Sequence, residues 1–309
     1  MCERTGTTAH AAAIAFATIT ATAPPACPAA SPTKPTATNP HCHQPPLPMK
    51  KKTENIIKIV SIVCIVLCSL VLLHYARRAL ICDRFIIKGH SMEPTLYGGR
   101  AVYVNKLIAG PRVFTDFDFS KPQLHCVRLP GLRDIRVGDF VVYNSPGGKG
   151  PGKIGFKVNY VYAKRCAACP GDTLSIIDSR YVNSRTGSIG VPPQNEERLK
   201  QMPDSLLLRL KCLRAGQFAQ MQDEWTVKDF GPVAVPRKGM SVTLSPETVD
   251  MYSRVIEYET GRPASELAGQ VYTFVKDYYF FIGDNVCDSR DSRYDGFVPE
   301  DFIIGVFKP

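Results

Sequence analysis

The sequence predicts a mainly β protein: antiparallel strands with a few helices, behind a single N-terminal membrane-spanning helix. Two observations lead to this fold class. One long apolar segment near residue 60 carries no charge, and the chain after it has short runs of β-branched and aromatic residues bounded by Gly, Pro, Asn or Asp. With 309 residues and 44% hydrophobic content, the chain can bury a sizeable core, which argues against disorder throughout.

Residues 1–48 differ in composition from everything after them. They are rich in Pro, Ala and Thr and have little to bury, so we predict a disordered, low-complexity extension. Met49 then opens "MKKKTENIIKIV", which is typical of the start of a membrane-anchored protein. We expect translation to begin at Met49, with residues 49–79 forming a basic N-terminus and the anchor.

The segment Ile59 to Ala76 is close to the roughly 20 residues that cross a hydrocarbon core. A buried core helix would show a polar face, and a cleaved signal sequence would be shorter. Basic residues precede the segment at 50–52 and follow it at 77–78, so the positive-inside rule does not decide its orientation. The net charge of +10 could suggest nucleic acid, but the basic residues are scattered among acidic ones apart from a few short clusters. Anionic lipid explains those clusters as well as DNA would, and we expect no nucleic-acid partner.

Six runs have strand character, and one segment has helix character. The helix is predicted over Ser245 to Thr260, because Ser245 suits the N-cap, Pro246 suits the first turn and acidic residues follow. The predicted strands lie within 84–89, 100–106, 138–145, 157–165, 172–178 and 278–285.

Ser91, in "GHSMEPTL", is a candidate nucleophile that needs a base to take its proton. No histidine follows His125. An α/β-hydrolase elbow is excluded because Glu93 replaces its second glycine and no late histidine exists. His125 in a different triad order stays open as an alternative.

Lysine is the other common base, provided that burial lowers its pKa enough to leave the amine neutral. The most apolar strand that carries one is "VNYVYAKRCAACPGD", which contains Lys164. With a period of two, Lys164 and Arg165 point to opposite faces and can have separate roles. An exposed lysine at a strand end is the alternative.

Four segments, in order, resemble the conserved boxes of bacterial type I signal peptidases. They are "GHSMEPTL" (89–96), "RVGDFVVY" (136–143), "AKRCAACPGD" (163–172) and "GDNVCDSRDSRYDGFVPEDFIIG" (283–305). The resemblance implies an antiparallel β-sheet catalytic domain with an inserted smaller α+β cap. It implies a catalytic core over 80–175, a cap over 176–270 and a return to the core over 271–309.

The resemblance also implies the chemistry. Ser91 would be the nucleophile and Lys164 the general base of a serine endopeptidase that acts through an acyl-enzyme. Ser289 matches a serine whose hydroxyl orients the lysine amine, while Asp291 and Arg293 match a structural ion pair.

Further positions match supporting residues of the family. Arg165 is expected to pair with Asp284 beneath the site. Met92 matches a packing residue, and Pro94 and Thr95 match the turn that fixes the nucleophile. Gly89 stands where some members carry an oxyanion-binding serine, so the backbone N–H of Ser91 and one further, unidentified donor are expected to form the oxyanion hole.

The substrates implied are exported preproteins with Ala-like residues one and three positions before the cut, bound as an added strand at a sheet edge. Residues 85–87 and 278–281 could line that groove, rest against lipid or form core strands. The implied location is the bacterial cytoplasmic membrane, crossed once, with the catalytic domain on the extracytoplasmic side.

Neither a metal nor a cofactor is expected. Cys166 and Cys169 have no second pair at zinc spacing and would lie roughly 10 Å apart in an extended strand unless a turn intervenes, so we predict small buried hydrophobes. The acidic residues around Asp288 are interleaved with arginines, which favours ion pairing over calcium.

Two other function classes remain open. A self-cleaving Ser-Lys repressor or polymerase subunit shares the chemistry but should carry a DNA-reading helical domain where this chain has an apolar span. A catalytically inactive membrane-anchored β protein would retain the same segments without activity.

Overall fold

The computed structural model describes residues 2–4, 51–116, 118, 125–147, 153–214, 218 and 225–309. By their contacts the residues form two units, one of 6–72 and one of 1–5 with 73–309. Each is described by itself below.

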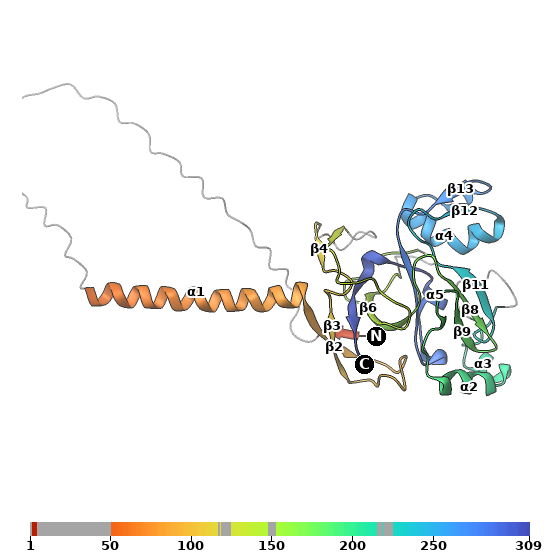
Figure 1. Ribbon diagram of the computed structural model, residues 1–309, viewed down its shortest axis with the longest axis horizontal. Helices are drawn as coiled ribbons and strands as arrows, with labels where there is room; N and C mark the ends of the chain where they lie inside the picture. The colour runs from red at the N-terminus through yellow and green to blue at the C-terminus, as the bar shows by residue number, and fades with distance from the viewer. Residues whose placement is uncertain are drawn as a thin grey trace, which may run out of the picture. The chain divides into compact units, whose positions relative to one another are not determined.

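The predicted span is part of one long helix, α1, over Lys51–Leu80 (Figure 1). Within its stretch Thr53–Leu80, the most apolar window of 18 residues has a mean hydropathy of 3.0, and none of that window is buried. It is the one helix in the described part of the chain that is long and apolar enough to cross a membrane. The exposed Ile, Val and Leu side chains lie all round the helix, which suits lipid better than a protein core.

The larger unit is built on an eight-stranded, mostly antiparallel sheet with the order β1-β2-β3-β16-β6-β7-β14-β15. All six predicted strand segments contain strands, five of them in this sheet. Its members are β1 (Cys2–Arg4), β2 (Cys82–Ile87), β3 (Ala101–Asn105), β6 (Phe140–Asn144), β7 (Val161–Ala168), β14 (Tyr278–Ile282), β15 (Val298–Pro299) and β16 (Ile303–Phe307).

Strand β1 corrects part of the expectation for residues 1–48. Cys2–Arg4 pairs with Phe85–Ile87 of β2, and Cys2 also pairs with Val161 of β7. The sheet therefore curls until β2 and β7 are separated by the width of one strand. Local composition could not reveal this pairing, because the backbone partners come from segments far away in the sequence. The rest of 1–48, including Met49 as a start, lies outside the described residues.

Smaller sheets and helices complete the unit. The sixth predicted strand is β8 (Thr173–Ile177), which begins a four-stranded sheet with β9 (Arg180–Asn183), β10 (Gly187–Ser188) and β11 (Phe230–Ala234). Two-stranded sheets are formed by β4 (Arg112–Phe114) with β5 (Cys126–Arg128), and by β12 (Ser241–Thr243) with β13 (Val271–Thr273). The remaining elements are α2 (Pro193–Gln201), α3 (Asp204–Arg209), α4 (Pro246–Thr260), α5 (Ser292–Asp295), η2 (Ala264–Leu267), η3 (Val286–Asp288) and η4 (Glu300–Phe302).

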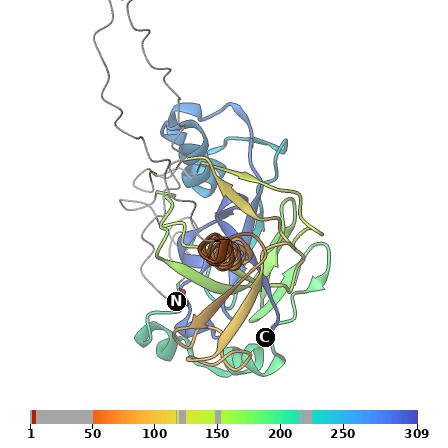
Figure 2. The ribbon, with the colours of Figure 1, turned by 90° about the vertical axis from the view of Figure 1, so that its left-hand side faces the viewer.

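The chain thus leaves the main sheet after β7 and returns to it at β14. The segment between them forms its own sheets and helices, and we call residues 176–270 the cap segment. In both views, α4 with the β12–β13 pair lies at one end of the unit, and α2 with α3 lies at the other (Figures 1 and 2). Contacts keep 73–309 in one compact unit, so the boundaries at 176 and 270 stay predictions about the chain's organisation.

The predicted helix is confirmed as α4. The Ser245 hydroxyl accepts a hydrogen bond from the backbone N–H of Thr248, as an N-cap should. The helix ends at Gly261, whose φ of 71° is the left-handed conformation that glycine adopts without strain. The short helices α2 and α3 were not predicted, because each buries a single leucine and so shows little apolar periodicity.

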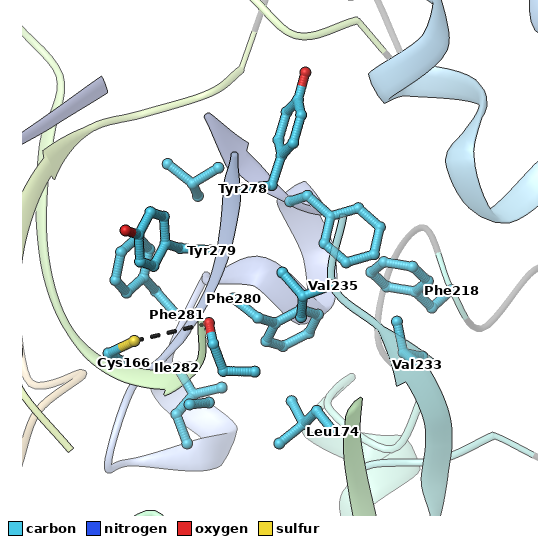
Figure 3. Close-up of a cluster of buried hydrophobic side chains, with 14 of the residues drawn as sticks. Cys166, Leu174, Phe218, Val233, Val235, Tyr278, Tyr279, Phe280, Phe281 and Ile282 are labelled. Carbon is cyan, nitrogen blue, oxygen red and sulfur yellow. Dashed lines mark hydrogen bonds between the residues drawn. The ribbon is translucent and has the colours of Figure 1, made fainter. Parts of the chain in front are cut away.

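A hydrophobic core joins the cap segment to the main sheet. Figure 3 shows β14 crossing this cluster, with Val233 of β11 and Phe218 on one side. The Phe280 ring lies 6.0 Å from the Phe218 ring and 6.0 Å from the Phe230 ring. The sequence left three possibilities for residues 278–281: the lining of a substrate groove, a contact with lipid or a core strand. All four residues are buried, so they form a core strand.

We predict that Phe280→Ala lowers the midpoint of thermal unfolding by roughly 10 °C, since emptying an aromatic core site costs about 3–5 kcal/mol. Tyr103→Ala is the matched control, because the Tyr103 side chain is 66% exposed. Circular dichroism of the detergent-solubilised chain measures both. Equal midpoints for the two variants would contradict the core described here.

Candidate active site

Ser91 lies in the turn that joins β2 to β3. Met92 (1% exposed) and Leu96 anchor this turn by packing into an apolar cluster beneath it. The Leu96 N–H donates to the Met92 carbonyl at 2.9 Å, which closes the turn. Gly89 precedes it with φ +85°, a conformation that other residues rarely adopt. The turn therefore holds a half-buried Ser91 on a rigid apolar base.

Lys164 projects from β7 toward this turn. Its Nζ lies 2.5 Å from Ser91 Oγ, within hydrogen-bonding distance, and the residue is only 1% exposed. Burial lowers the pKa of Lys164 to about 8, while the nearby Asp291 carboxylate opposes that shift. Close to neutral pH, a useful fraction of this amine is therefore unprotonated and able to accept a proton.

Arg165 points to the other face of β7, as the strand period predicts. Its Nε and Nη2 donate to the two carboxylate oxygens of Asp284 at 2.8 and 2.7 Å, and both residues are buried. The guanidinium also lies over the Phe140 ring, 4.4 Å from its centroid. Thr95 Oγ1 donates to the same carboxylate, so this ion pair connects β7 to the nucleophile turn.

Asp291 is the centre of a second buried network. It accepts hydrogen bonds from Arg293 Nη2 at 2.7 Å, the Ser289 hydroxyl at 2.6 Å and the Gly283 N–H at 2.9 Å. Burial alone would raise the pKa of Asp291, but Arg293, together with Lys164 and the Ser289 hydrogen bond, holds it below its usual value. The Ser289 hydroxyl uses its one proton in donating to Asp291, which leaves its oxygen lone pairs as acceptors, so the expected role of Ser289 in orienting the Lys164 amine stays a prediction.

The other ionisable candidates near Ser91 are already engaged. His90 Nδ1 lies 2.6 Å from Glu93 Oε1, and that hydrogen bond raises the pKa of His90. Three acidic residues of the last box pair with arginines: Asp284 with Arg165, Asp291 with Arg293 and Asp295 with Arg290. Ion pairing with the interleaved arginines is thus confirmed for Asp291 and Asp295, while Asp284 pairs with an arginine of β7.

The prediction for Cys166 on β7 and Cys169 just after it is also confirmed. Cys166 is 0% exposed and Cys169 is 6% exposed, and both belong to the main core. Their sulfur atoms lie 3.7 Å apart rather than the roughly 10 Å of a continuous strand, because β7 ends at Ala168 and a turn follows. Cys166 Sγ contacts the Ala168 carbonyl at 3.7 Å, the dashed line of Figure 3.

Gly283 is a site residue that the sequence reasoning missed. A Cβ there would lie 2.1 Å from Ser289 Oγ and 2.5 Å from the Ser91 carbonyl oxygen, so only glycine fits. The sequence "FFIGDN" could have indicated this position, because a glycine directly after a buried strand often marks a close approach of another segment.

Two asparagines were missed as well, and both hold the nucleophile turn. The Asn285 N–H donates to the Ser91 carbonyl at 3.0 Å, and its side chain donates to the His90 carbonyl at 3.1 Å. Asn195 on α2 donates to the carbonyls of Glu93 (3.1 Å) and Asp284 (2.6 Å). Nothing in the local sequence around Asn195 indicated this contact, which depends on how the cap segment folds.

We predict that Asp291→Asn costs about 3–5 kcal/mol of unfolding free energy, because it leaves the buried Arg293 charge without its carboxylate. Lys200→Ala is the control, since it breaks an ion pair with Asp178 whose side chains are 45% and 61% exposed. Thermal unfolding compares the two variants with the wild type. An Asp291→Asn midpoint no lower than that of Lys200→Ala would refute a stabilising role for the network.

The chain matches the family model of signal peptidase, peptidase S26, over residues 56–308. Signal peptidase I P of Bacillus subtilis subsp. natto is 26% identical over 245 residues, covering 79% of this chain and 82% of the relative. Signal peptidase I of Pseudomonas aeruginosa is 26% identical over 228 residues, covering 73% of this chain and 60% of the relative. A crystal structure of a signal peptidase I from Enterococcus faecalis is 18% identical, with a TM-score of 0.29, and covers 57% of this chain and 97% of that one.

Three of the segments that resemble this family, 89–96, 163–172 and 283–305, meet around Ser91, and the fourth contributes β6, which pairs with β7. The family match extends from within α1 to the last strand. The chain therefore belongs to the signal peptidase, peptidase S26, family.

Proposed function

We propose that this membrane-anchored signal peptidase cleaves exported preproteins with Ser91 as nucleophile and Lys164 as general base. The observation that carries the proposal is the 2.5 Å contact between Lys164 Nζ and Ser91 Oγ, made by an amine that burial holds at a low pKa. A serine hydroxyl needs such a base within reach, and neither His90 nor His125 is the partner of Ser91 among the described residues.

The proton transfers follow from this contact. The neutral amine takes the Ser91 proton as Oγ attacks the scissile carbonyl, and the resulting ammonium then protonates the leaving amine. This leaves an acyl-enzyme and a neutral Lys164. The same amine next takes a proton from water, whose oxygen attacks the ester, and returns it to Ser91 as the acid product leaves.

The surrounding residues keep the pair in position. Gly283 lets the Ser91 backbone and Ser289 approach closely, and Asn285 fixes the Ser91 carbonyl. The Ser289 hydroxyl is proposed to orient the Lys164 amine while it donates to Asp291, whose carboxylate lies near enough to influence the lysine. Arg165, Asp284 and Thr95 set the distance between β7 and the nucleophile turn, while Met92 packs below it and Pro94 lies within the turn.

The oxyanion hole is proposed to use the backbone N–H of Ser91. Gly89 has no side chain, so no side-chain donor comes from that position, although a Cβ there would meet no described atom within 4 Å. A single donor of this kind is typically worth roughly 2.7–4 kcal/mol in the transition state.

Substrate binding is proposed to add a strand between β2 and β7. The pairing of β1 with both strands supports this, because three extended residues already fit there, next to the strand that carries Lys164. A peptide in the same place would form backbone hydrogen bonds and present alternate side chains to the surface around Ser91. Ala-like residues one and three positions before the cut would suit the surface around Ser91.

Membrane placement is proposed from α1. As a lipid-embedded single span, it would keep the catalytic domain at the surface of the bacterial cytoplasmic membrane, on the extracytoplasmic side, where preproteins emerge. A self-cleaving repressor is not favoured, because an apolar helix stands where a DNA-reading domain would be required. An inactive relic is not favoured either, because the Ser-Lys contact and its supporting networks are intact.

We expect Ser91→Ala and Lys164→Ala each to reduce cleavage of a model preprotein by at least about a thousandfold, since each removes one half of the dyad. Lys238→Ala, at an exposed lysine of the same unit, should retain full activity. Mass spectrometry of the products measures the rate and identifies the bond cut. Full activity in either dyad variant would exclude the mechanism.

The pH profile tests the role of the lysine. Because the neutral amine is the active form, kcat/KM should rise with pH through an apparent pKa near 8, well below 10.5 for an ordinary lysine. Initial rates between pH 6 and pH 10 on one preprotein measure it. A profile that is flat across this range, or that rises only above pH 10, contradicts a depressed lysine pKa.

A further inference from the structure

We propose that Cys212 and Cys287 form a disulfide that ties the cap segment to the catalytic loop. Their sulfur atoms lie 2.6 Å apart. The thiols of Cys166 and Cys169, by comparison, rest against each other at 3.7 Å. A disulfide bond measures about 2.05 Å, so the first pair lies much closer to bonding distance than two unbonded thiols do.

The two cysteines come from segments with different tasks. Cys212 follows α3 in the cap segment, where its N–H donates to the Leu207 carbonyl at 3.0 Å. Cys287 lies in η3, between Asp284, which pairs with Arg165, and Ser289, which donates to Asp291. The Val286 carbonyl next to Cys287 accepts a hydrogen bond from Arg293 at 3.1 Å. A bond between the sulfurs would therefore fix the loop that carries the supporting networks of the dyad.

The exposure of the two residues indicates how the bond forms. Cys212 is 1% exposed, and burial raises the pKa of its thiol to about 12, whereas Cys287 is only half-buried. The Cys287 thiolate would attack the disulfide of an oxidised thiol carrier, giving a mixed disulfide and one released thiol. Cys212, losing its proton, would then displace the second thiol. Two cysteine thiols are oxidised and one carrier disulfide is reduced to two thiols.

The inference rests on the proposed extracytoplasmic side for its setting, because disulfides persist in oxidising compartments. The bond would join positions 75 residues apart in the sequence. Closing a loop of that length restricts the unfolded chain and stabilises the fold, and it would also limit movement of η3 relative to the cap.

The direct test uses the full chain in detergent, equilibrated with oxidised glutathione, alkylated and digested without reduction. We expect a linked peptide pair containing Cys212 and Cys287 that disappears after reduction with dithiothreitol. Recovery of both cysteines in alkylated form, or of either one linked elsewhere, would overturn the proposal.

A second test uses Cys212→Ser, Cys287→Ser and the double variant. Each single variant should lower the thermal midpoint of the oxidised enzyme by roughly 5–15 °C, and the double variant should lower it no further, because either change removes the whole bond. Dithiothreitol should lower the wild-type midpoint by a similar amount and leave the variants unchanged. Additive losses that do not respond to reductant would count against the bond.

Ser91→Ala separates this inference from the proposed function. The variant should keep the linked peptide while losing cleavage. An unlinked but active wild type would refute the disulfide alone, and a linked enzyme in which Ser91→Ala still cleaves would refute the dyad alone.

Discussion

The arrangement of the site centres on one contact, between a buried lysine amine and a serine hydroxyl. An ammonium at this position would pay a large desolvation penalty, and burial therefore holds the pKa of Lys164 near 8. Lys164 is 1% exposed on the buried strand β7, beside Val141 of β6 and with its Nζ 5.9 Å from the centre of the Tyr162 ring. Two buried ion pairs, Arg165 with Asp284 and Arg293 with Asp291, then fix the segments on either side of the contact.

Much of this could be predicted from the sequence, because the relevant information is local. The alternation along β7 placed Lys164 and Arg165 on opposite faces, and the absence of late histidines left a lysine as the base for Ser91. The capping residues predicted the bounds of α4 to within one residue. The long apolar run predicted the membrane span that lies within α1.

Other features could not be predicted, because they depend on contacts between segments that are far apart in the sequence. The strand β1 exists because β2 and β7 offer backbone partners from distant segments. Asn195 reaches the nucleophile turn only because α2 packs beside it, and no local pattern showed that the Ser289 hydroxyl donates to Asp291. Gly283 could have been singled out, yet the reason for a glycine there appears only when Ser91 and Ser289 are seen on either side of it.

The most direct measurement is an NMR titration of the Lys164 side chain in the full chain, labelled with ¹³C-lysine and solubilised in detergent. The signal that disappears in Lys164→Arg identifies the residue. The account predicts a transition near pH 8, with the neutral amine populated under working conditions. A Lys164 that stays cationic until about pH 10.5, like an exposed lysine, would contradict it.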